Sequence, residues 1–373
     1  MSAETTTNSF TQKAIIHGLS KKASDWHFTS GEPLSLRISG EMCKCDGTDG
    51  HPDLKVNGKE IDELMVGHTP EAERSAFEAG QGQHLDVSDI IEGERFRLHF
   101  EWVTSMSGLR QAAAVLRHIP NALPLMENSG LPFGYEKLIQ SPPPHGLILV
   151  TGASGSGKTT TLAASINYLN QHFANKIYTL EAPVEFFHRS QKSLVIHRSV
   201  GADVPTFQKG IEAAMRSDPD IILVGEMRDL DTISATLSAA ETGHLVFASL
   251  HTNNAPGALS RILDAAPEGT RDQYRAMLAT SLRAVLAQRL VPKIGGGRTG
   301  VFEYMVNTPA VASQIRENKI GQLRGTIKSG KEHHMVSLDQ SLKRLVIEKK
   351  ITRETALEFA DNRPELEQDL RTA

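Results

Sequence analysis

A glycine-rich stretch near the middle of the chain constrains its fold more than any other feature. It spans residues 152–159 with the sequence GASGSGKT, directly after the apolar run 147–150 and before a helical pattern. Glycines in such a turn let backbone N–H groups surround a phosphate, and the N-terminus of the following helix adds partial positive charge. A strand, a loop with G-x-x-x-x-G-K-[ST] spacing and a helix together predict a site for a nucleoside triphosphate.

Residues of this loop have distinct predicted roles. Lys158 is placed to reach the β and γ phosphates, and the Thr159 hydroxyl to hold Mg²⁺. A glycine-rich turn that carries Lys-Thr and binds nothing is the alternative, but every fixed position of the motif is occupied. The predicted nucleotide-binding residues are Gly152, Ala153, Ser154, Gly155, Ser156, Gly157, Lys158, Thr159 and Thr160.

The composition is that of an ordinary folded protein without a dominant charge. The chain has 373 residues, of which 39% are hydrophobic and 23% charged, with a formal net charge of −4. This length favours two domains. A chain so close to neutral has no overall attraction for nucleic acid, and direct nucleic-acid binding is not expected. No apolar run is long enough to cross a bilayer and residues 1–10 contain no secretion signal, so we expect a cytoplasmic protein.

The two cysteines, Cys43 and Cys45, lie in a polar segment. A second pair of cysteines, which would complete a common type of zinc site, is absent from the sequence. The pattern therefore favours free thiols in a reducing compartment over a zinc site.

The pattern of elements divides the chain. Residues 1–118 combine helical segments with segments that are apolar at every second residue, which predicts a small α+β domain. Residues 119–132 repeat Pro, Asn and Gly and are interpreted as a linker. In residues 133–373 short apolar strands alternate with helices, which is typical of a parallel sheet covered on both faces. From about residue 290 onward the pattern predicts a mostly helical part, interrupted by a short strand at residues 299–303.

A metal-side carboxylate is expected at the end of a buried strand. Residues 220–226 read DIILVGE, an apolar run followed by a glycine and Glu226. Beside a phosphate loop such an acid serves the Mg²⁺ ion, directly or through water, whereas alone it could be a surface glutamate. We expect the sheet order to place this strand tip next to the loop.

Further acids and histidines follow other strands. Glu181 and Glu185 come after the strand that ends at Leu180, at the edge of the sheet where parallel α/β proteins bind ligands. Either acid could orient the water that attacks the γ-phosphate, and either could be a solvated loop residue. Of two histidines that flank a later strand, His251 at its carboxyl end fits a contact with the γ-phosphate better than His244.

Together these motifs resemble the secretion-ATPase superfamily. In order they are GASGSGKT, EAPVE at 181–185, SDPDIILVGEMRD at 217–229, ETGHLVFASLHT at 241–252 and AQRL at 287–290. Within the superfamily the chain is similar to the PilT-type branch, which holds pilus-retraction motors and the ATPases of type IVB secretion and conjugation. It looks most like the DotB type of the latter. The resemblance extends from about residue 23 to about residue 354.

The resemblance implies a RecA-like ATPase core that follows a PAS-like N-terminal domain. It also implies that residues 152–159 form the Walker A loop and that Glu226 belongs to the Walker B element. Glu185 matches the catalytic glutamate of the family, and His244 and His251 match its histidine box.

The same resemblance implies a homo-hexameric ring, in which the N-terminal domain of one subunit supplies arginines to its neighbour's nucleotide. Arg97 and Arg117 match those arginines best. An arginine supplied in this way neutralises charge that develops on the γ-phosphate.

The chain departs from the family pattern in three places. The usual E-D-P-[IV]-E carries Ala182 in place of its second acid, which concentrates the chemistry on Glu185 and leaves Glu181 in reserve. Residues 41–62 look longer and more polar than in retraction motors, which favours the secretion branch. A helix motif of retraction motors is present only in weakened form at residues 322–328.

From these observations we predict a Mg²⁺-dependent hexameric ATPase that powers type IVB secretion or conjugative transfer. It would be recruited to the inner membrane face by a secretion platform or partner ATPase. The first alternative is a pilus-retraction motor. The second is a DNA translocase or helicase on the same core fold, which the slightly acidic charge and 5% aromatic content disfavour.

Overall fold

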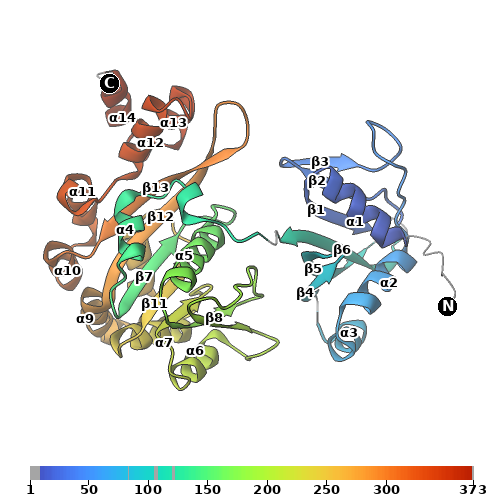
Figure 1. Cartoon of the computed structure of the whole chain (residues 1–373), viewed down its shortest axis with the longest axis horizontal. Helices are drawn as coiled ribbons and strands as arrows, with labels where there is room; N and C mark the ends of the chain where they lie inside the picture. Colours follow the sequence, from blue (N-terminus) through green and yellow to red (C-terminus); the bar gives the residue numbers. More distant parts are fainter. Residues whose placement is uncertain (1–8, 83, 105–107, 120–121, 372–373) are drawn as a thin grey trace. The chain divides into compact units, whose positions relative to one another are not determined.

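The structure is a computed structural model that describes residues 9–82, 84–104, 108–119 and 122–371. The chain forms two compact units, Met1–Ala122 and Leu123–Ala373 (Figure 1). Within the described ranges, every helix is too short or too polar to span a bilayer.

The first unit is built around an antiparallel sheet with the strand order β3-β2-β1-β6-β5-β4. Helix α1 precedes the sheet, and α2 and α3 lie between β3 and β4 in the chain. The bounds are α1 (Phe10–Ser20), β1 (Ala23–Thr29), β2 (Ser35–Ile38), β3 (Glu41–Lys44), α2 (Gly58–His68), α3 (Glu71–Glu78), β4 (His84–Ile91), β5 (Glu94–Thr104) and β6 (Arg110–Ile119). This order is consistent with the PAS-like domain that the resemblance implied.

The period-two pattern of the strands separates a core face from a polar face. In β5, Phe96, Leu98 and Phe100 are buried in one cluster with residues of all three helices, whereas Arg97 and His99 point to the other side. Helices α1, α2 and α3 therefore cover one face of this sheet and leave the other face polar.

The second unit contains a seven-stranded sheet with the order β13-β12-β7-β11-β10-β8-β9. All neighbouring strands are parallel except β12 and β13. The strands are β7 (Gly146–Thr151), β8 (Lys176–Glu181), β9 (Leu194–Ser199), β10 (Ile221–Val224), β11 (Leu245–Leu250), β12 (Leu282–Pro292) and β13 (Arg298–Val306). The α-helices are α4 (Phe133–Gln140), α5 (Lys158–His172), α6 (Phe207–Met215), α7 (Leu230–Glu241), α8 (Ala255–Ala265), α9 (Arg271–Ser281), α10 (Pro309–Arg316), α11 (Leu323–Ser329), α12 (Leu338–Ile347), α13 (Arg353–Phe359) and α14 (Arg363–Arg371).

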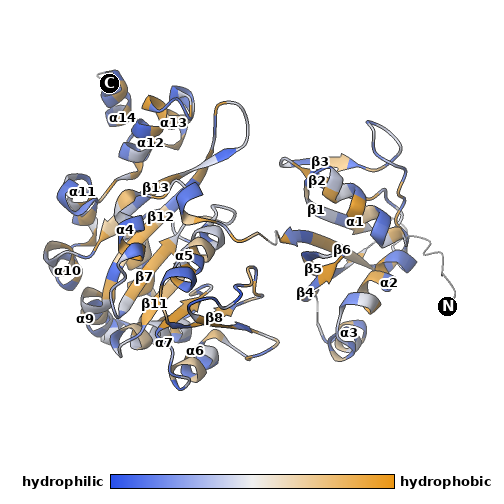
Figure 2. Cartoon of the chain, viewed as in Figure 1, coloured by the Kyte–Doolittle hydropathy of each residue, from blue (hydrophilic) through white to orange (hydrophobic). Residues whose placement is uncertain are grey.

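Two apolar layers enclose this sheet. In β7, Ile148 and Val150 belong to a cluster with α4 and α5, while Leu147 and Leu149 belong to a cluster with α6 to α11. The central strands β7 and β11 are buried along their whole length and are drawn as hydrophobic in Figure 2. Near-continuous apolar strands are the expected result of burial on both faces.

The predicted linker at residues 119–132 is too long. Met126 and Leu131 are buried in the cluster that contains Tyr135 and Ile139 of α4, so this stretch is part of the second unit. Its Pro and Asn residues break helix and strand patterns, but its apolar side chains still pack. Residues 120–121 of that prediction lie outside the described residues.

The prediction of a mostly helical part from about residue 290 is also wrong at its start. Strand β12 extends to Pro292, where a helix was expected. The predicted short strand at residues 299–303 lies within the longer β13, which pairs along its length with β12. The Ala, Leu, Gln and Arg residues of β12 are good helix formers, but pairing with β7 and β13 in a buried sheet overrides that preference. Beyond β13, the regular structure is helical up to residue 371.

The sheet order differs from the prediction at one point that concerns the site. The strand before Glu226, β10, is not adjacent to β7, because β11 lies between them. The residues that follow β11, including His251, therefore come between the loop and Glu226.

Candidate nucleotide-binding site

The glycine-rich loop joins the carboxyl end of β7 to the first turn of α5. The helix cap Gly157 has a φ of +90°, a conformation that favours glycine, and makes no side-chain cap. No side chain at the cap position therefore binds the first N–H groups of α5, which leaves these groups available to an anion. A Cβ at Gly152 would lie 2.4 Å from the carbonyl oxygen of Gln288, so only glycine fits there.

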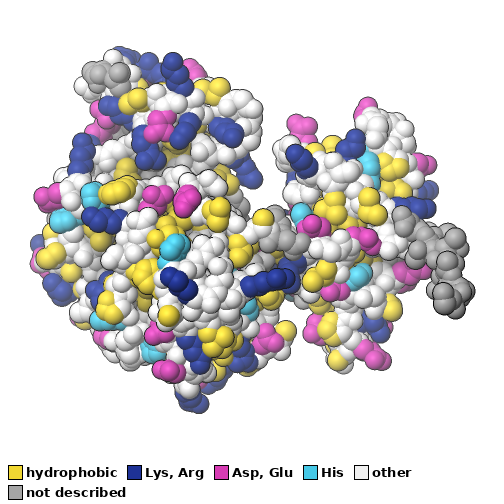
Figure 3. All heavy atoms as spheres, in the orientation of Figure 1, with side chains coloured by type: hydrophobic (Ala, Val, Ile, Leu, Met, Phe, Trp, Pro, Cys, Tyr) yellow, Lys and Arg dark blue, Asp and Glu magenta, His cyan; other side chains and the backbone are white. Residues whose placement is uncertain are grey.

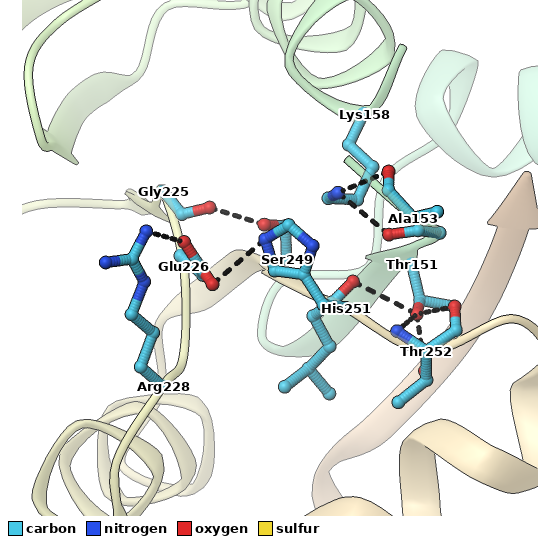
Figure 4. A network of polar contacts seen from close by, with 11 residues as sticks. Thr151, Ala153, Lys158, Gly225, Glu226, Arg228, Ser249, His251 and Thr252 are labelled. Atoms are coloured by element: carbon cyan, nitrogen blue, oxygen red, sulfur yellow. Dashed lines mark hydrogen bonds and ion pairs between the residues drawn. The ribbon is translucent and has the colours of Figure 1, made fainter. Parts of the chain in front are cut away.

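Lys158 is the first residue of α5 and folds back onto the loop. Its ammonium donates to the carbonyl oxygens of Gly152 at 2.8 Å and Ala153 at 3.1 Å (Figure 4). Burial lowers the pKa of Lys158, while the Glu226 and Glu185 carboxylates act in the opposite direction. The structure thus brings Lys158 into the electrostatic range of both predicted acids.

The rest of the loop presents a mixture of exposed and buried groups. Ala153, Ser154, Gly155 and Thr160 are exposed and Thr159 is half-buried. Ser156 is buried, and its hydroxyl has no hydrogen-bond partner among the described residues. A buried hydroxyl without a protein partner suits a loop that binds a polar ligand.

Gln288 binds the glycine-rich loop and the first turns of α5 through its side chain, a role that the sequence did not reveal. Its side-chain amide donates to the Ser156 carbonyl at 2.7 Å and accepts from the Thr161 hydroxyl at 2.8 Å. The residue is buried in β12. Its motif, AQRL, was informative only as part of the resemblance, because nothing in the sequence places β12 beside β7.

Glu226 lies in a cluster of charged side chains at the same edge of the sheet (Figure 4). One carboxylate oxygen is 2.7 Å from the Arg228 guanidinium and the other is 3.0 Å from His251 Nε2. The Ser249 hydroxyl donates to the carbonyl of Gly225 at 2.5 Å, which ties the end of β11 to the turn after β10. These contacts fix the direction in which Glu226 points.

The two histidines lie at opposite ends of β11. His251 follows the carboxyl end and reaches Glu226, whereas His244 precedes the amino end and its Nδ1 is 3.0 Å from the Ala239 carbonyl. The structure therefore brings His251, and not His244, to the loop edge.

Glu181 and Glu185 have different surroundings. Glu181 ends β8 and is 7% exposed, while Glu185 is half-buried. Burial raises the pKa of Glu181 to about 7, although hydrogen bonds from the Glu185 N–H and the Thr179 hydroxyl oppose the rise. Glu181 thus accepts a hydrogen bond from the backbone of Glu185, and its carboxyl group is partly protonated near neutral pH.

The two predicted arginines are direct neighbours in the first unit. Arg97 in β5 pairs in register with Arg117 in β6, which places both on the polar face of the sheet. Arg117 Nε lies 2.8 Å from Asp25, and Arg97 lies 3.4 Å from Asp86. All four side chains line a cavity of about 380 Å³.

Charged side chains of the two signs are interspersed on the surface. On the face drawn in Figure 3, Lys and Arg side chains alternate with Asp and Glu side chains instead of forming one continuous basic area.

Comparison with known proteins identifies the family of the second unit. Residues 121–297 match the family described as "Type II/IV secretion system protein". The Pseudomonas aeruginosa protein named "Type IV pilus retractation ATPase PilT" is 41% identical over 339 residues, which cover 91% of this chain and 94% of that protein. The two sequences therefore align over almost the full length of both chains.

Solved structures give the same assignment. The pilus retraction motor PilT with bound ADP matches with a TM-score of 0.83 and 37% identity, covering 95% of this chain and 98% of that one. The Legionella pneumophila ATPase DotB matches with a TM-score of 0.79 and 24% identity, covering 95% and 96%. The second likeness shows the fold alone. These folds confirm the predicted combination of an N-terminal antiparallel domain and a parallel-sheet ATPase core.

Proposed function

The chain is a nucleotide-binding ATPase of the type II/IV secretion family, in its PilT-like branch, and on that premise we propose that it is a pilus-retraction motor. The similarity to PilT along almost the full length of both chains, at 41% identity, carries this proposal. It reverses the order of the two functions predicted from the sequence, where type IVB secretion came first. The similarity to DotB, at 24% identity, supports the shared fold and not a shared task.

In the proposed mechanism the loop and the N-terminus of α5 bind the phosphates of ATP. The Lys158 ammonium, which now binds the carbonyls of Gly152 and Ala153, exchanges them for phosphate oxygens. Gln288 keeps the loop in shape during this exchange through its bonds to Ser156 and Thr161.

The residues at this edge fit a Mg²⁺ ion. A hydroxyl from Thr159 and a carboxylate from Glu226 are the hard oxygen donors that this ion takes together with phosphates. When bound, Mg²⁺ neutralises charge on the transferred phosphoryl group. Arg228 and His251 hold the Glu226 carboxylate in place on its two oxygens.

We assign water activation to Glu185 and a positioning role to Glu181. Glu185 is half-buried and acts electrostatically on Lys158, so it shares the surroundings of the loop. Glu181 is buried behind it and accepts a hydrogen bond from its N–H at 3.5 Å. His251, in contact with Glu226, would report the state of the γ-phosphate through that carboxylate.

The chain would work as a homo-hexamer at the cytoplasmic face of the inner membrane, docked on a pilus platform. In that ring Arg97 and Arg117 of one subunit would act on the nucleotide of the next. Their acidic partners, Asp86 and Asp25, hold the guanidinium groups in defined positions. Movement of the first unit against the second would follow hydrolysis.

Deletion of the gene in its own host tests the proposal. A retraction motor leaves pili extended when it is lost, so the deletion strain should carry more surface pili and lose twitching motility. Restoring the wild-type chain should reverse both changes, and restoring Lys158→Ala should not. Unchanged piliation with a loss of protein secretion or conjugative transfer would overturn the assignment in favour of the secretion branch.

A further inference from the structure

A cluster of two histidines and a cysteine lies in the first unit, away from the residues of the proposed mechanism. His17 on α1, Cys45 just after β3 and His51 in the following loop place one ligand atom each within 4.8 Å of one another. Among the described residues, no other group of three or more histidine, cysteine or acidic side chains brings its ligand atoms this close together. We propose that these three residues bind a zinc ion.

The distances suit zinc. His17 Nε2 and His51 Nδ1 lie 3.0 Å apart. Two nitrogens bound to one tetrahedral zinc at about 2.0 Å each are about 3.3 Å apart, so these atoms already have nearly the separation that the ion requires. The thiol must approach the same point to about 2.3 Å. The Cys45 thiol lies within 4.8 Å of both nitrogens, so it has to move toward them when the ion binds.

The backbone holds the three segments in place. The Cys45 N–H donates to Leu34 at 2.8 Å, and its carbonyl accepts from Leu54 at 2.9 Å. A bridge between Asp46 and Asp53 closes the loop that carries His51. Helix α1 is fixed by the Trp26 indole, which donates to the Ala14 carbonyl at 2.9 Å. The fold therefore fixes the backbone of the three segments that carry the ligands.

The ligand types also select the metal. Two imidazoles and one thiolate suit zinc and similar borderline ions, whereas Mg²⁺ prefers oxygen. The thiolate, and not the thiol, is the form of cysteine that binds zinc. The zinc–sulfur bond therefore forms as the thiol proton leaves to solvent. His17 and His51 are half-buried, and water completes the tetrahedral set of a zinc ion that has three protein ligands.

The sequence pattern favoured free thiols because it contains no second pair of cysteines. The two histidines come from a helix before Cys45 and a loop after it, and only the fold brings them together. This inference does not depend on the proposed function, since it concerns a binding site of the first unit alone.

Cobalt titration of the untagged full chain, reduced with a phosphine and kept in excess Mg²⁺, tests the site. We expect one equivalent of Co²⁺ per chain to produce a sulfur-to-cobalt charge-transfer band in the near ultraviolet, and Zn²⁺ to displace it. The phosphate-loop site holds no sulfur and cannot give this band. Cys43→Ser is the matched control and should keep the band, whereas Cys45→Ser should lose it.

A second measurement guards against variants that merely misfold. Both tryptophans, Trp26 and Trp102, belong to the first unit, so their fluorescence follows the unfolding of that unit. Zn²⁺ should raise this transition temperature in the wild type and in Cys43→Ser, but not in His51→Gln, whose side chain lies in a half-exposed loop. Absence of the band in folded wild-type protein, or its persistence in Cys45→Ser, would overturn the proposal.

Discussion

The phosphate loop and the arginine face are built in opposite ways. The loop takes its shape from one contiguous stretch between β7 and α5, and it binds mostly through backbone groups. The arginine face takes its side chains from separate strands, with Arg97 on β5, Arg117 on β6 and their acids on β4 and β1. Local sequence decides the first, and strand register decides the second.

The acids of the two regions differ as well. In the first unit the buried Asp25 has the guanidinium of Arg117 as a partner at 2.8 Å. In the second unit the buried Glu181 is bound by a backbone N–H and a hydroxyl, and its pKa rises to about 7. Asp25 thus anchors a guanidinium group, whereas Glu181 is buried without a cation beside it and binds a proton more readily than an ordinary glutamate does. The following variants test this contrast.

The largest effect is expected at the loop. Lys158→Ala removes an ammonium group that contacts the loop, and turnover should fall about 10³-fold, as for the loss of a strong charge-stabilising donor. Phosphate release by the purified protein measures the change, with circular dichroism as the check of folding. Wild-type turnover in the variant would refute the role of the loop in catalysis.

The next effect separates the two acids after β8. Glu185→Gln should lower kcat about 10²-fold or more, because it removes the proposed base. Glu181→Gln is the matched control. It retains a hydrogen-bond acceptor for the Glu185 N–H, and we expect a loss below about 10-fold. The reverse order of the two losses, with a flattened pH–rate profile in Glu181→Gln, would make Glu181 the base.

The pH dependence of stability provides a third test. An acid with an ordinary pKa of 4.5 and a folded-state pKa of about 7 binds more protons when folded between these values. The free energy of unfolding therefore falls as pH rises through this window and levels off above it, by about 3 kcal/mol in total. Glu181→Gln should remove this fall, so the variant gains stability relative to the wild type at pH 8 but not at pH 4.

Urea unfolding of the second unit, followed by circular dichroism at the two pH values, measures this difference. Glu303 is an independent case, because burial raises its pKa to about 7 as well. Glu303→Gln should show the same sign. An equal gain of Glu181→Gln at both pH values would mean that packing, and not protonation, causes it.

The smallest effect is expected at the arginine face. Arg97→Ala or Arg117→Ala should lower turnover about 10- to 100-fold, the value of one hydrogen bond to a charged group, and leave nucleotide affinity within about 2-fold. Arg37 is the matched control, because it pairs in register with Asp25 from the other side. Arg37→Ala should retain wild-type turnover. Equal losses in all three variants would indicate a structural role for this face.

Much of the site could be predicted because each of its segments carries its own local signal, a glycine-rich loop or a polar residue at the end of an apolar strand. The loop at 152–159, Glu226 after its apolar strand and His251 after β11 were all identified at the ends of parallel strands, and the structure brings them together. The local sequence features did not predict the function within the family in the same way. Residues 41–62 and the weakened motif at 322–328 pointed to the secretion branch, while full-length similarity favours the retraction motor.

What the sequence could not reveal depends on pairings between distant segments. Strand β12 was missed because its residues prefer helix in isolation, and with it the support that Gln288 gives to the loop. The position of β11 between β7 and β10 likewise follows from burial of the whole sheet.

The sequence by itself determined the chemistry of the phosphate loop, because a turn that binds through backbone N–H groups needs only glycines and a helix in the right order. Only the tertiary structure decided which side chains face that loop, how Arg97 and Arg117 meet, and that His17, Cys45 and His51 converge. The reason is physical: strand pairing and helix packing are selected by the burial of apolar surface over the entire unit. No local pattern records the neighbours that this burial creates.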